Sequence, residues 1–255
     1  MEQKAIFIIL DISGYTRFML SKEKRALAHA QIIISELLEE VLKHVELPMF
    51  VAKLEGDAIF LYATEEGLDH FSLAMRAFVG ERLLLFFDVF YARLVDIRGH
   101  MASCNCGGCR NADKLRIKAV IHSGMALFYR IGRFEEVAGQ DVILVHRLLK
   151  NSVPSREYIL MTKEAYREIT FPCRLPFTEH RENYEDVGDV KAFVFIPPSR
   201  DEELDRCLAR FHEEESALMR GLKKLKHVGV VFSKYLLPVS LKVRRLRPLR
   251  NLKEE

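Results

Sequence analysis

Short apolar runs alternate along most of the chain with longer segments whose apolar residues recur at helical spacing. The run Ala5–Leu10 is continuously apolar and rich in β-branched residues, which predicts a strand covered on both faces. It ends at the turn signal Asp11–Gly14. From about Lys22 to His44, apolar residues repeat every three or four positions with glutamates between them, so this segment is predicted to be a long amphipathic helix.

Further elements follow from the same patterns. Met49–Lys53 and Ala58–Thr64 predict a hairpin that closes through the tight turn Leu54–Asp57. The segment Leu68–Leu94 is apolar around much of its circumference and predicts a largely buried helix. The other expected elements are a second pair of strands at Leu115–His122 and Met125–Ile131 around Ser123-Gly124, helices at Asp141–Lys150 and Lys163–Glu168, and strands at Tyr158–Met161 and Lys191–Ile196.

This order of elements predicts an α+β fold, in which a mixed sheet has helices packed on it. At 255 residues the chain suits one main domain, which we place at residues 1–198, with a Cys-rich insertion at about 100–113. Beyond it, residues 199–255 are expected to form a basic helical extension. With 49% hydrophobic and 29% charged residues, the composition is that of an ordinary globular protein.

The charge of this extension has two interpretations. Between Arg220 and Glu255 there are eleven Lys or Arg residues and only two Glu. These charges flank the apolar segment Val228–Val243, which is too short and polar to span a bilayer. The extension could contact an anionic membrane surface weakly, or its apolar stretch could pack on the acidic remainder of the chain or on a second copy. No motif supports nucleic-acid binding, so we expect none.

The N-terminal sequence and the cysteines both bear on the compartment. The apolar run after Lys4 is too brief for the core of a signal peptide. Three of the five cysteines fall within six residues, which is unlike the spread pattern of a disulfide framework. We therefore expect a cytoplasmic protein.

Two carboxylates, Asp11 and Asp57, stand at turns that directly follow or join apolar strands. If those strands are neighbours, both side chains converge, and such a pair suits a divalent cation beside a nucleoside triphosphate. Gly14 and Gly56 would let the backbone approach the phosphates closely. The simpler interpretation is that Asp11 caps a helix and Asp57 forms a turn.

Four ordered motifs resemble the catalytic domains of class III nucleotide cyclases. The family pattern Phe-x-Asp-Ile-x-Gly-Phe-Thr is matched by Ile9–Thr16, and Lys-x-x-Gly-Asp-Ala by Lys53–Ala58. Ile-x-His-x-Gly appears as Ile121–Gly124, and the pattern around Val-Asn-x-Ala-x-Arg-Leu as Glu136–Leu148. The chain is also similar to a smaller bacterial branch of cyclase-like proteins that carries a Cys-rich insertion. The implied fold is a ferredoxin-like βαββαβ core.

The resemblance implies a role for each matching residue. Asp11 and Asp57, helped by the backbone carbonyl of Ile12, would bind two Mg²⁺ or Mn²⁺ ions. Lys53 matches the residue that selects adenine, which favours ATP, and Glu136 stands where its Asp partner is usual. Arg147 matches the arginine that stabilises phosphate charge in the transition state. In the family two subunits face each other head to tail, so a homodimer is implied.

Two departures from the family pattern leave the activity open. The Asn that orients the ribose is replaced by Ile143, which can neither donate nor accept a hydrogen bond. The usual Lys before a Gly near the end of the domain is replaced by Val187. One interpretation is an adenylate cyclase that converts ATP to cyclic AMP and pyrophosphate. The alternative is a degenerate module that binds nucleotide or dimerises without turnover.

The Cys-rich insertion places Cys104, Cys106 and Cys109 close together, with His100 just upstream. Thiolates and imidazole are the preferred ligands of Zn²⁺, so these four residues are candidates for a structural zinc site. The Cys-x-Cys spacing is one residue shorter than the Cys-x₂-Cys spacing of the usual zinc knuckle. The alternative interpretation is that the three cysteines are free or redox-active thiols.

Overall fold

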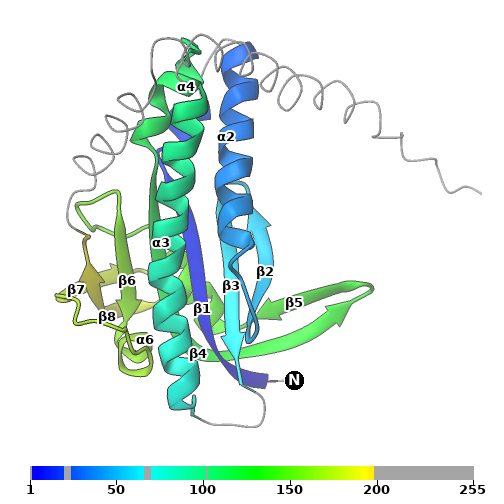
Figure 1. Ribbon diagram of the computed structural model, residues 1–255. Coiled ribbons are helices and arrows are strands. Elements are labelled where there is room, and N and C mark those ends of the chain that lie inside the picture. Colours follow the sequence, from blue (N-terminus) through cyan, green and yellow to red (C-terminus); the bar gives the residue numbers. More distant parts are fainter. Residues whose placement is uncertain (1, 20–23, 66–69, 102, 198–255) are drawn as a thin grey trace, which may run out of the picture. The chain divides into compact units, whose positions relative to one another are not determined.

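The computed structural model describes residues 2–19, 24–65, 70–101 and 103–197 (Figure 1). The predicted extension at residues 199–255, with both interpretations of its basic charge, lies outside the described residues, so the boundary near residue 198 stays a prediction. No helix in the described ranges is long and apolar enough to cross a membrane.

Within these ranges the elements alternate between strands and helices, as the sequence patterns indicate. In chain order they are β1 (Glu2–Ser13), α1 (Tyr15–Met19), α2 (Lys24–Leu42), β2 (Met49–Glu55), β3 (Ala58–Thr64), α3 (Leu73–Met101), α4 (Gly107–Asn111), the 3-10 turn η1 (Ala112–Lys114), β4 (Arg116–Ile131), β5 (Phe134–Ala138), α5 (Gln140–Arg147), β6 (Tyr158–Thr162), α6 (Lys163–Glu168), β7 (Thr178–Tyr184) and β8 (Gly188–Phe195).

The described strands form one mixed sheet in the order β2-β3-β1-β4-β6-β8-β7, and β5 pairs with β4. All neighbours are antiparallel except β4 and β6, which run parallel. β1 lies between β3 and β4, and its segment Ala5–Leu10 is fully buried. A strand with six consecutive buried residues must be covered on both faces. The sequence prediction of an α+β fold with a mixed sheet and packed helices is therefore confirmed.

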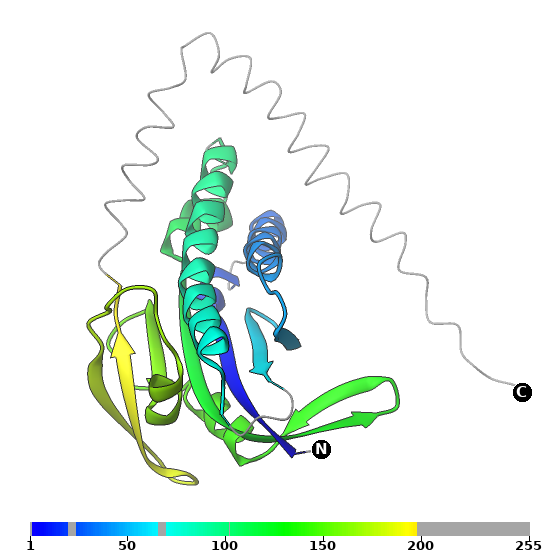
Figure 2. The ribbon, with the colours of Figure 1, turned by 60° about the horizontal axis from the view of Figure 1, so that its bottom comes forward.

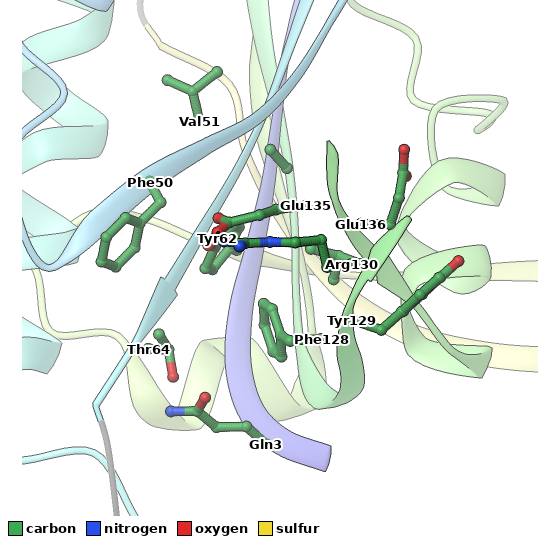
Figure 3. Close-up of a pocket in the computed structure, with 12 residues that line it drawn as sticks. Gln3, Phe50, Val51, Tyr62, Thr64, Phe128, Tyr129, Arg130, Glu135 and Glu136 are labelled. Carbon is green, nitrogen blue, oxygen red and sulfur yellow. Dashed lines mark hydrogen bonds and ion pairs between the residues drawn. The ribbon is translucent and has the colours of Figure 1, made fainter. Parts of the chain in front are cut away.

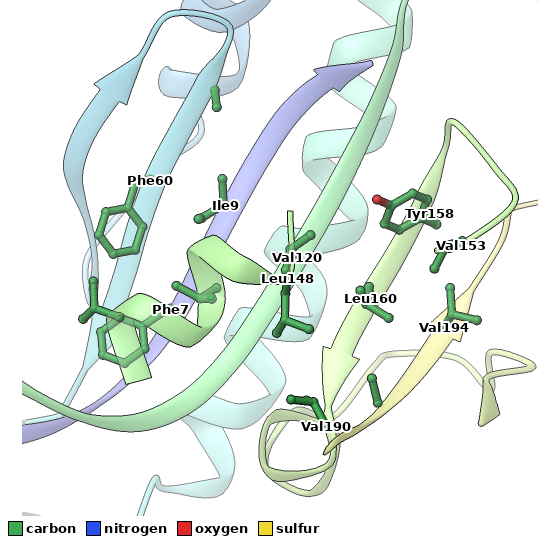
Figure 4. Packing of buried hydrophobic residues seen from close by; sticks show 14 of the residues in the cluster. Phe7, Ile9, Phe60, Val120, Leu148, Val153, Tyr158, Leu160, Val190 and Val194 are labelled. Carbon is green, nitrogen blue, oxygen red and sulfur yellow. The ribbon is translucent and has the colours of Figure 1, made fainter. Parts of the chain in front are cut away.

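Helices cover both faces of the sheet. α2 and α3 lie against one face (Figure 1), and α5 packs on the opposite face, where its C-cap residue Leu148 joins a core cluster with Phe7, Ile9 and Phe60 (Figure 4). Side chains alternate along a strand, so the residue that follows Phe7 and Ile9 on this α5 face is Asp11. The hydrophobic core thus fixes the face on which the first candidate ligand lies.

The prediction of a strand break at Ser123-Gly124 is wrong, because β4 runs without interruption from Arg116 to Ile131. Gly124 instead allows the side chain of Asp141 to lie against the backbone of β4, because a Cβ at position 124 would lie 2.1 Å from Oδ2 of Asp141. The turn falls at Gly132, whose φ is +60°, and the resulting β4–β5 hairpin extends away from the body of the sheet (Figure 2).

The strand β7 was missed by the sequence analysis. Its sequence is charged, and most of its residues are exposed or half-buried, as expected for a strand at the edge of a sheet. Such a strand shows no apolar alternation for a pattern search to detect.

Candidate active site

A row of polar side chains crosses the sheet on the α5 face. The registers place Asp11 of β1 opposite Ala58 of β3 on one side and opposite Lys118 of β4 on the other. Lys118 is in turn paired with Tyr158 of β6. The structure therefore assembles Asp11, Lys118 and Tyr158 side by side, at the end of β1 and next to the β2–β3 turn.

Asp57 lies in that turn and brings a second carboxyl group to Asp11. The backbone N–H of Ile12 donates to the carbonyl of Asp57 over 3.2 Å, which holds the turn against β1. Burial and the neighbouring charge of Asp11 raise the pKa of Asp57 to about 6. A bound cation can stabilise the ionised form of such a carboxyl group beside a second carboxylate.

Lys118 is a part of this site that the sequence analysis missed. Its Nζ lies 2.8 Å from Oδ2 of Asp11. Burial lowers the pKa of Lys118, but the hydrogen bond to Asp11 and the nearby charges outweigh it and raise the pKa above its ordinary value. A charged residue inside the apolar strand Leu115–His122 is the signal that could have found it.

Gly56 has the role in the turn that its position predicts. Its φ is +72°, in the left-handed region that favours glycine, and open space lies where a side chain would stand. Gly14 also has a positive φ, +96°, where the chain leaves β1. Both glycines therefore shape the backbone directly beside Asp11 and Asp57.

A cavity of about 380 Å³ opens between β2, β3 and the β4–β5 hairpin (Figure 3). Phe50, Tyr62 and Phe128 form a continuous aromatic wall, with ring centroids 5.2 Å apart for the first pair and 5.0 Å for the second. Glu136 lines the same cavity. Lys53 follows the lining residue Ala52 on β2, and its side chain is exposed.

The motifs Ile121–Gly124 and Glu136–Leu148 meet through Asp141. Nε2 of the buried His122 lies 3.0 Å from Oδ1 of Asp141, and the backbone N–H of Met125 donates to Oδ2 over 2.6 Å. The hydrogen bond with His122 lowers the pKa of Asp141. His122 is thus a core histidine, and it anchors the first turn of α5.

The two remaining positions of interest lie on α5. Arg147 forms an ion pair with Asp186 in the β7–β8 turn, with 2.5 Å between Nη2 and Oδ2. Ile143 is 55% exposed. In the described part of the chain, the ion pair of Arg147 is thus with Asp186 and not with Asp11 or Asp57.

The Cys-rich insertion is arranged differently from the prediction. The residue grouped with Cys104, Cys106 and Cys109 is His29 of α2, not His100. Nδ1 of His100 instead lies 2.8 Å from the backbone carbonyl of Asp96, one helical turn earlier in α3. The prediction of His100 as fourth ligand failed because it used only nearby sequence, whereas α2 crosses the insertion from a distant part of the chain.

Comparison with known proteins identifies relatives of the sequence. A family model described as "Protein of unknown function (DUF2652)" matches residues 34–158. The uncharacterized protein Rv2561/Rv2562 of Mycobacterium tuberculosis is 34% identical over 157 residues, which is 62% of this chain and 70% of that protein. The chain belongs to the family of this mycobacterial protein. The matched region of the family model includes Asp57, Lys118 and the three clustered cysteines.

Solved structures with a similar fold are nucleotide cyclase domains. The guanylyl cyclase Cya2 superposes with a TM-score of 0.54 and 11% identity, over 79% of this chain and 96% of that chain. A bacterial light-regulated adenylyl cyclase gives a TM-score of 0.53 and 12% identity, over 83% of this chain and 99% of that chain. At such identity the likeness shows the fold alone. This family member therefore has the fold of adenylyl and guanylyl cyclase catalytic domains.

Proposed function

We propose that this chain is a nucleotide-cyclase-like protein that binds ATP with Mg²⁺ or Mn²⁺ and converts it to cyclic AMP and pyrophosphate. The observation that carries the proposal is the Asp11–Asp57 carboxyl pair at the end of β1 on the α5 face. The aromatic-walled cavity lies farther back along the same strands, where Tyr62 pairs with Phe7. In the reaction the ribose 3′-oxygen bonds to the α-phosphorus, and the bond from that phosphorus to pyrophosphate breaks.

The donor set fits divalent metal ions. Asp11 and Asp57 offer hard carboxylate oxygens, and the carbonyl of Ile12, which follows Asp11 on β1, adds a third oxygen. When bound, the ions would neutralise phosphate charge and lower the pKa of the ribose hydroxyl. The two carboxylates would hold the triphosphate end of the nucleotide next to β1, while Gly56, which has open space beside it, lets the backbone approach it.

The cavity beside β2 suits a purine base. Base–aromatic stacking contributes about 1–3 kcal/mol per base, and Phe50, Tyr62 and Phe128 offer such surfaces. Glu136 would accept a hydrogen bond from the exocyclic amino group of adenine, and Lys53 would donate to a ring nitrogen. We therefore favour ATP, with Lys53 and Glu136 of one copy in a homodimer reading the base of the nucleotide whose phosphates lie at the carboxylates of the other copy.

Exposed apolar side chains favour a homodimer. On the β4–β5 hairpin Ile131 is 61% exposed and Phe134 59% exposed, and Met125 and Leu127 stand out on the same strand β4. Large exposed apolar side chains in one region indicate a contact surface. A second copy placed there would bury the hairpin, and in the shared site we assign to Arg147 the stabilisation of phosphate charge.

Two observations favour binding without turnover as the second candidate function. Ile143 cannot orient a ribose hydroxyl, and loss of one positioning contact can cost about a hundredfold in rate. Lys118 already supplies a positive charge to Asp11, so it competes with a metal ion for that carboxylate. In this alternative the protein binds nucleotide or dimerises, and no cyclic product forms.

Product analysis separates the two candidates. Purified full-length protein at high concentration is incubated with ATP and Mn²⁺, and cyclic AMP is measured by mass spectrometry. The cyclase proposal expects product that disappears in Asp57→Ala. Absence of product from a protein that still binds ATP would establish the second candidate, and equal product from Asp57→Ala would contradict the assigned site.

The aromatic wall gives a prediction of its own. Tyr62→Ala should weaken ATP binding about 10-fold or more, because the base loses its central stacking surface. Tyr62→Phe keeps the ring and should bind ATP nearly as well as the original protein. Calorimetric titration of both variants checks this, and equal affinity of Tyr62→Ala and Tyr62→Phe would place the base elsewhere.

A further inference from the structure

Three thiols and one buried imidazole converge where the insertion crosses α2, outside the cyclase-like site. His29, which is 5% exposed, projects from α2, and the cysteines come from the segment between α3 and η1. Cys104 precedes α4, Cys106 is its N-terminal cap, and Cys109 lies within it. Their four ligand atoms all lie within 4.8 Å of one another.

The distances around His29 are those of a tetrahedral site. Its Nδ1 lies 3.3 Å from Sγ of Cys109 and 3.5 Å from Sγ of both Cys104 and Cys106. One imidazole nitrogen has a single hydrogen or a single lone pair, so a hydrogen bond accounts for only one of these contacts. Around a tetrahedral Zn²⁺, with Zn–N of about 2.0–2.1 Å and Zn–S of about 2.3 Å, each N–S edge is about 3.5 Å.

We propose that His29, Cys104, Cys106 and Cys109 bind one Zn²⁺ ion. The set supplies four protein ligands of the types that zinc prefers, so the site is closed and its role is structural. A disulfide, the competing product of clustered thiols, would join two of the sulfurs and leave the third thiol and the imidazole without a function. The convergence of all three sulfurs on one nitrogen therefore favours the metal.

The surroundings of the thiols fit a bound cation. The backbone N–H of Cys109 points at Sγ of Cys106 over 3.4 Å, the kind of outer contact that orients a metal-bound thiolate. Gly108 allows α4 to lie directly on α2, since a Cβ there would come 2.8 Å from the backbone carbonyl of Ala26. Close contact between the two helices is what carries the cysteines to His29.

The proposed ion would join two parts of the chain that flank the carboxylate site. α2 follows β1, which carries Asp11, after the short helix α1, and the Cys-rich segment leads through η1 into β4, which carries Lys118. Zinc would thus fix the start of β4 relative to α2. This role does not depend on nucleotide binding, so the zinc proposal and the proposed function can fail separately.

Metal content of the full-length protein tests the proposal. Protein from zinc-supplemented cultures should carry one Zn²⁺ per chain by mass spectrometry of the metal, and replacement with Co²⁺ should give the absorption of a tetrahedral site with thiolate ligands. His29→Ala should lose most of the zinc. His100→Ala is the matched control and should keep it, as should Asp57→Asn, which alters only the carboxylate pair.

Two further measurements keep the test decisive if His29→Ala does not fold. His29→Cys replaces one zinc ligand by another and should retain the metal. In the zinc-loaded original protein, the three clustered thiols should resist a thiol reagent until a chelator is added. The site would be overturned if the protein carried no stoichiometric zinc or gave no tetrahedral Co²⁺ spectrum. It would also be overturned if the three thiols of the zinc-loaded protein reacted freely, or if a folded His29→Ala kept its full zinc content.

Discussion

Asp57→Asn is expected to stabilise the metal-free protein at pH 8 by about 1–2 kcal/mol and to abolish its stabilisation by Mn²⁺. The pKa of Asp57 is raised from 3.8 to about 6 by burial and by the charge of Asp11. The full linkage value of such a shift is about 3 kcal/mol, and we halve it because the carboxyl group is only partly buried and solvent screens it. Asn removes the unfavourable charge and also removes a metal ligand.

The sign of this effect depends on pH. Because the pKa of folded Asp57 lies above that of the unfolded chain, the folded state binds more protons between pH 4 and pH 6. The stability contributed by the protonated carboxyl group is therefore complete below pH 4 and is lost as the pH rises through 6. Asp57→Asn should gain most at pH 8 and almost nothing near pH 4.

Urea unfolding in EDTA at the two pH values measures the gain, and thermal unfolding with and without Mn²⁺ measures the metal effect. Glu185→Gln, which removes a charge from the exposed β7–β8 turn, is the matched control and should change neither. A metal-free Asp57→Asn that is less stable than the original protein at pH 8 would show that Asp57 serves the fold and not a cation.

Gly124→Ala is expected to cost about 2–3 kcal/mol of folding stability and to displace α5. A Cβ at this position would lie 2.1 Å from Oδ2 of Asp141 and 2.6 Å from its Cβ. The carboxylate would have to move, and its contacts with His122 and with the backbone N–H of Met125 would be lost. Since α5 carries Arg147, nucleotide turnover should fall with stability.

A double-mutant cycle separates this clash from a general loss of strand stability. Asp141→Ala removes the two closest contacts, so Gly124→Ala should cost clearly less in that background than in the original chain. Chemical denaturation of the four proteins gives the coupling energy. Additive costs would mean that Gly124 is needed for some reason other than the approach of Asp141.

The local elements of the site could be predicted because their signals lie within short stretches of sequence. Ala5–Leu10 is apolar throughout and forms the buried strand β1, and the predicted strand Ala58–Thr64 coincides with β3. The turn between the β2 and β3 hairpin strands has the expected glycine at Gly56. Asp11 lies near the end of β1 and Asp57 lies in the β2–β3 turn, so their proximity could be predicted if the two strands are neighbours.

The remaining features depend on contacts between distant segments. Lys118 reaches Asp11 only through the pairing of β1 with β4, and His29 reaches the cysteines only because α2 crosses the insertion. The sequence around Gly124 predicts a turn. The reason for a glycine there is instead the close approach of the Asp141 side chain, which comes from α5. Strand pairing and helix packing between distant segments cannot be determined from a single sequence, so these contacting residues could not be assigned from it.

Calorimetric titration of ATP into the full-length protein, with and without Mn²⁺, tests most directly whether Asp11 and Asp57 form a metal-dependent nucleotide site. Mn²⁺ should strengthen ATP binding about 10-fold or more in the original protein, and this gain should be absent in Asp57→Asn. If the ATP affinity is the same with and without the metal, or if the gain with Mn²⁺ survives in Asp57→Asn, the two carboxylates do not form such a site.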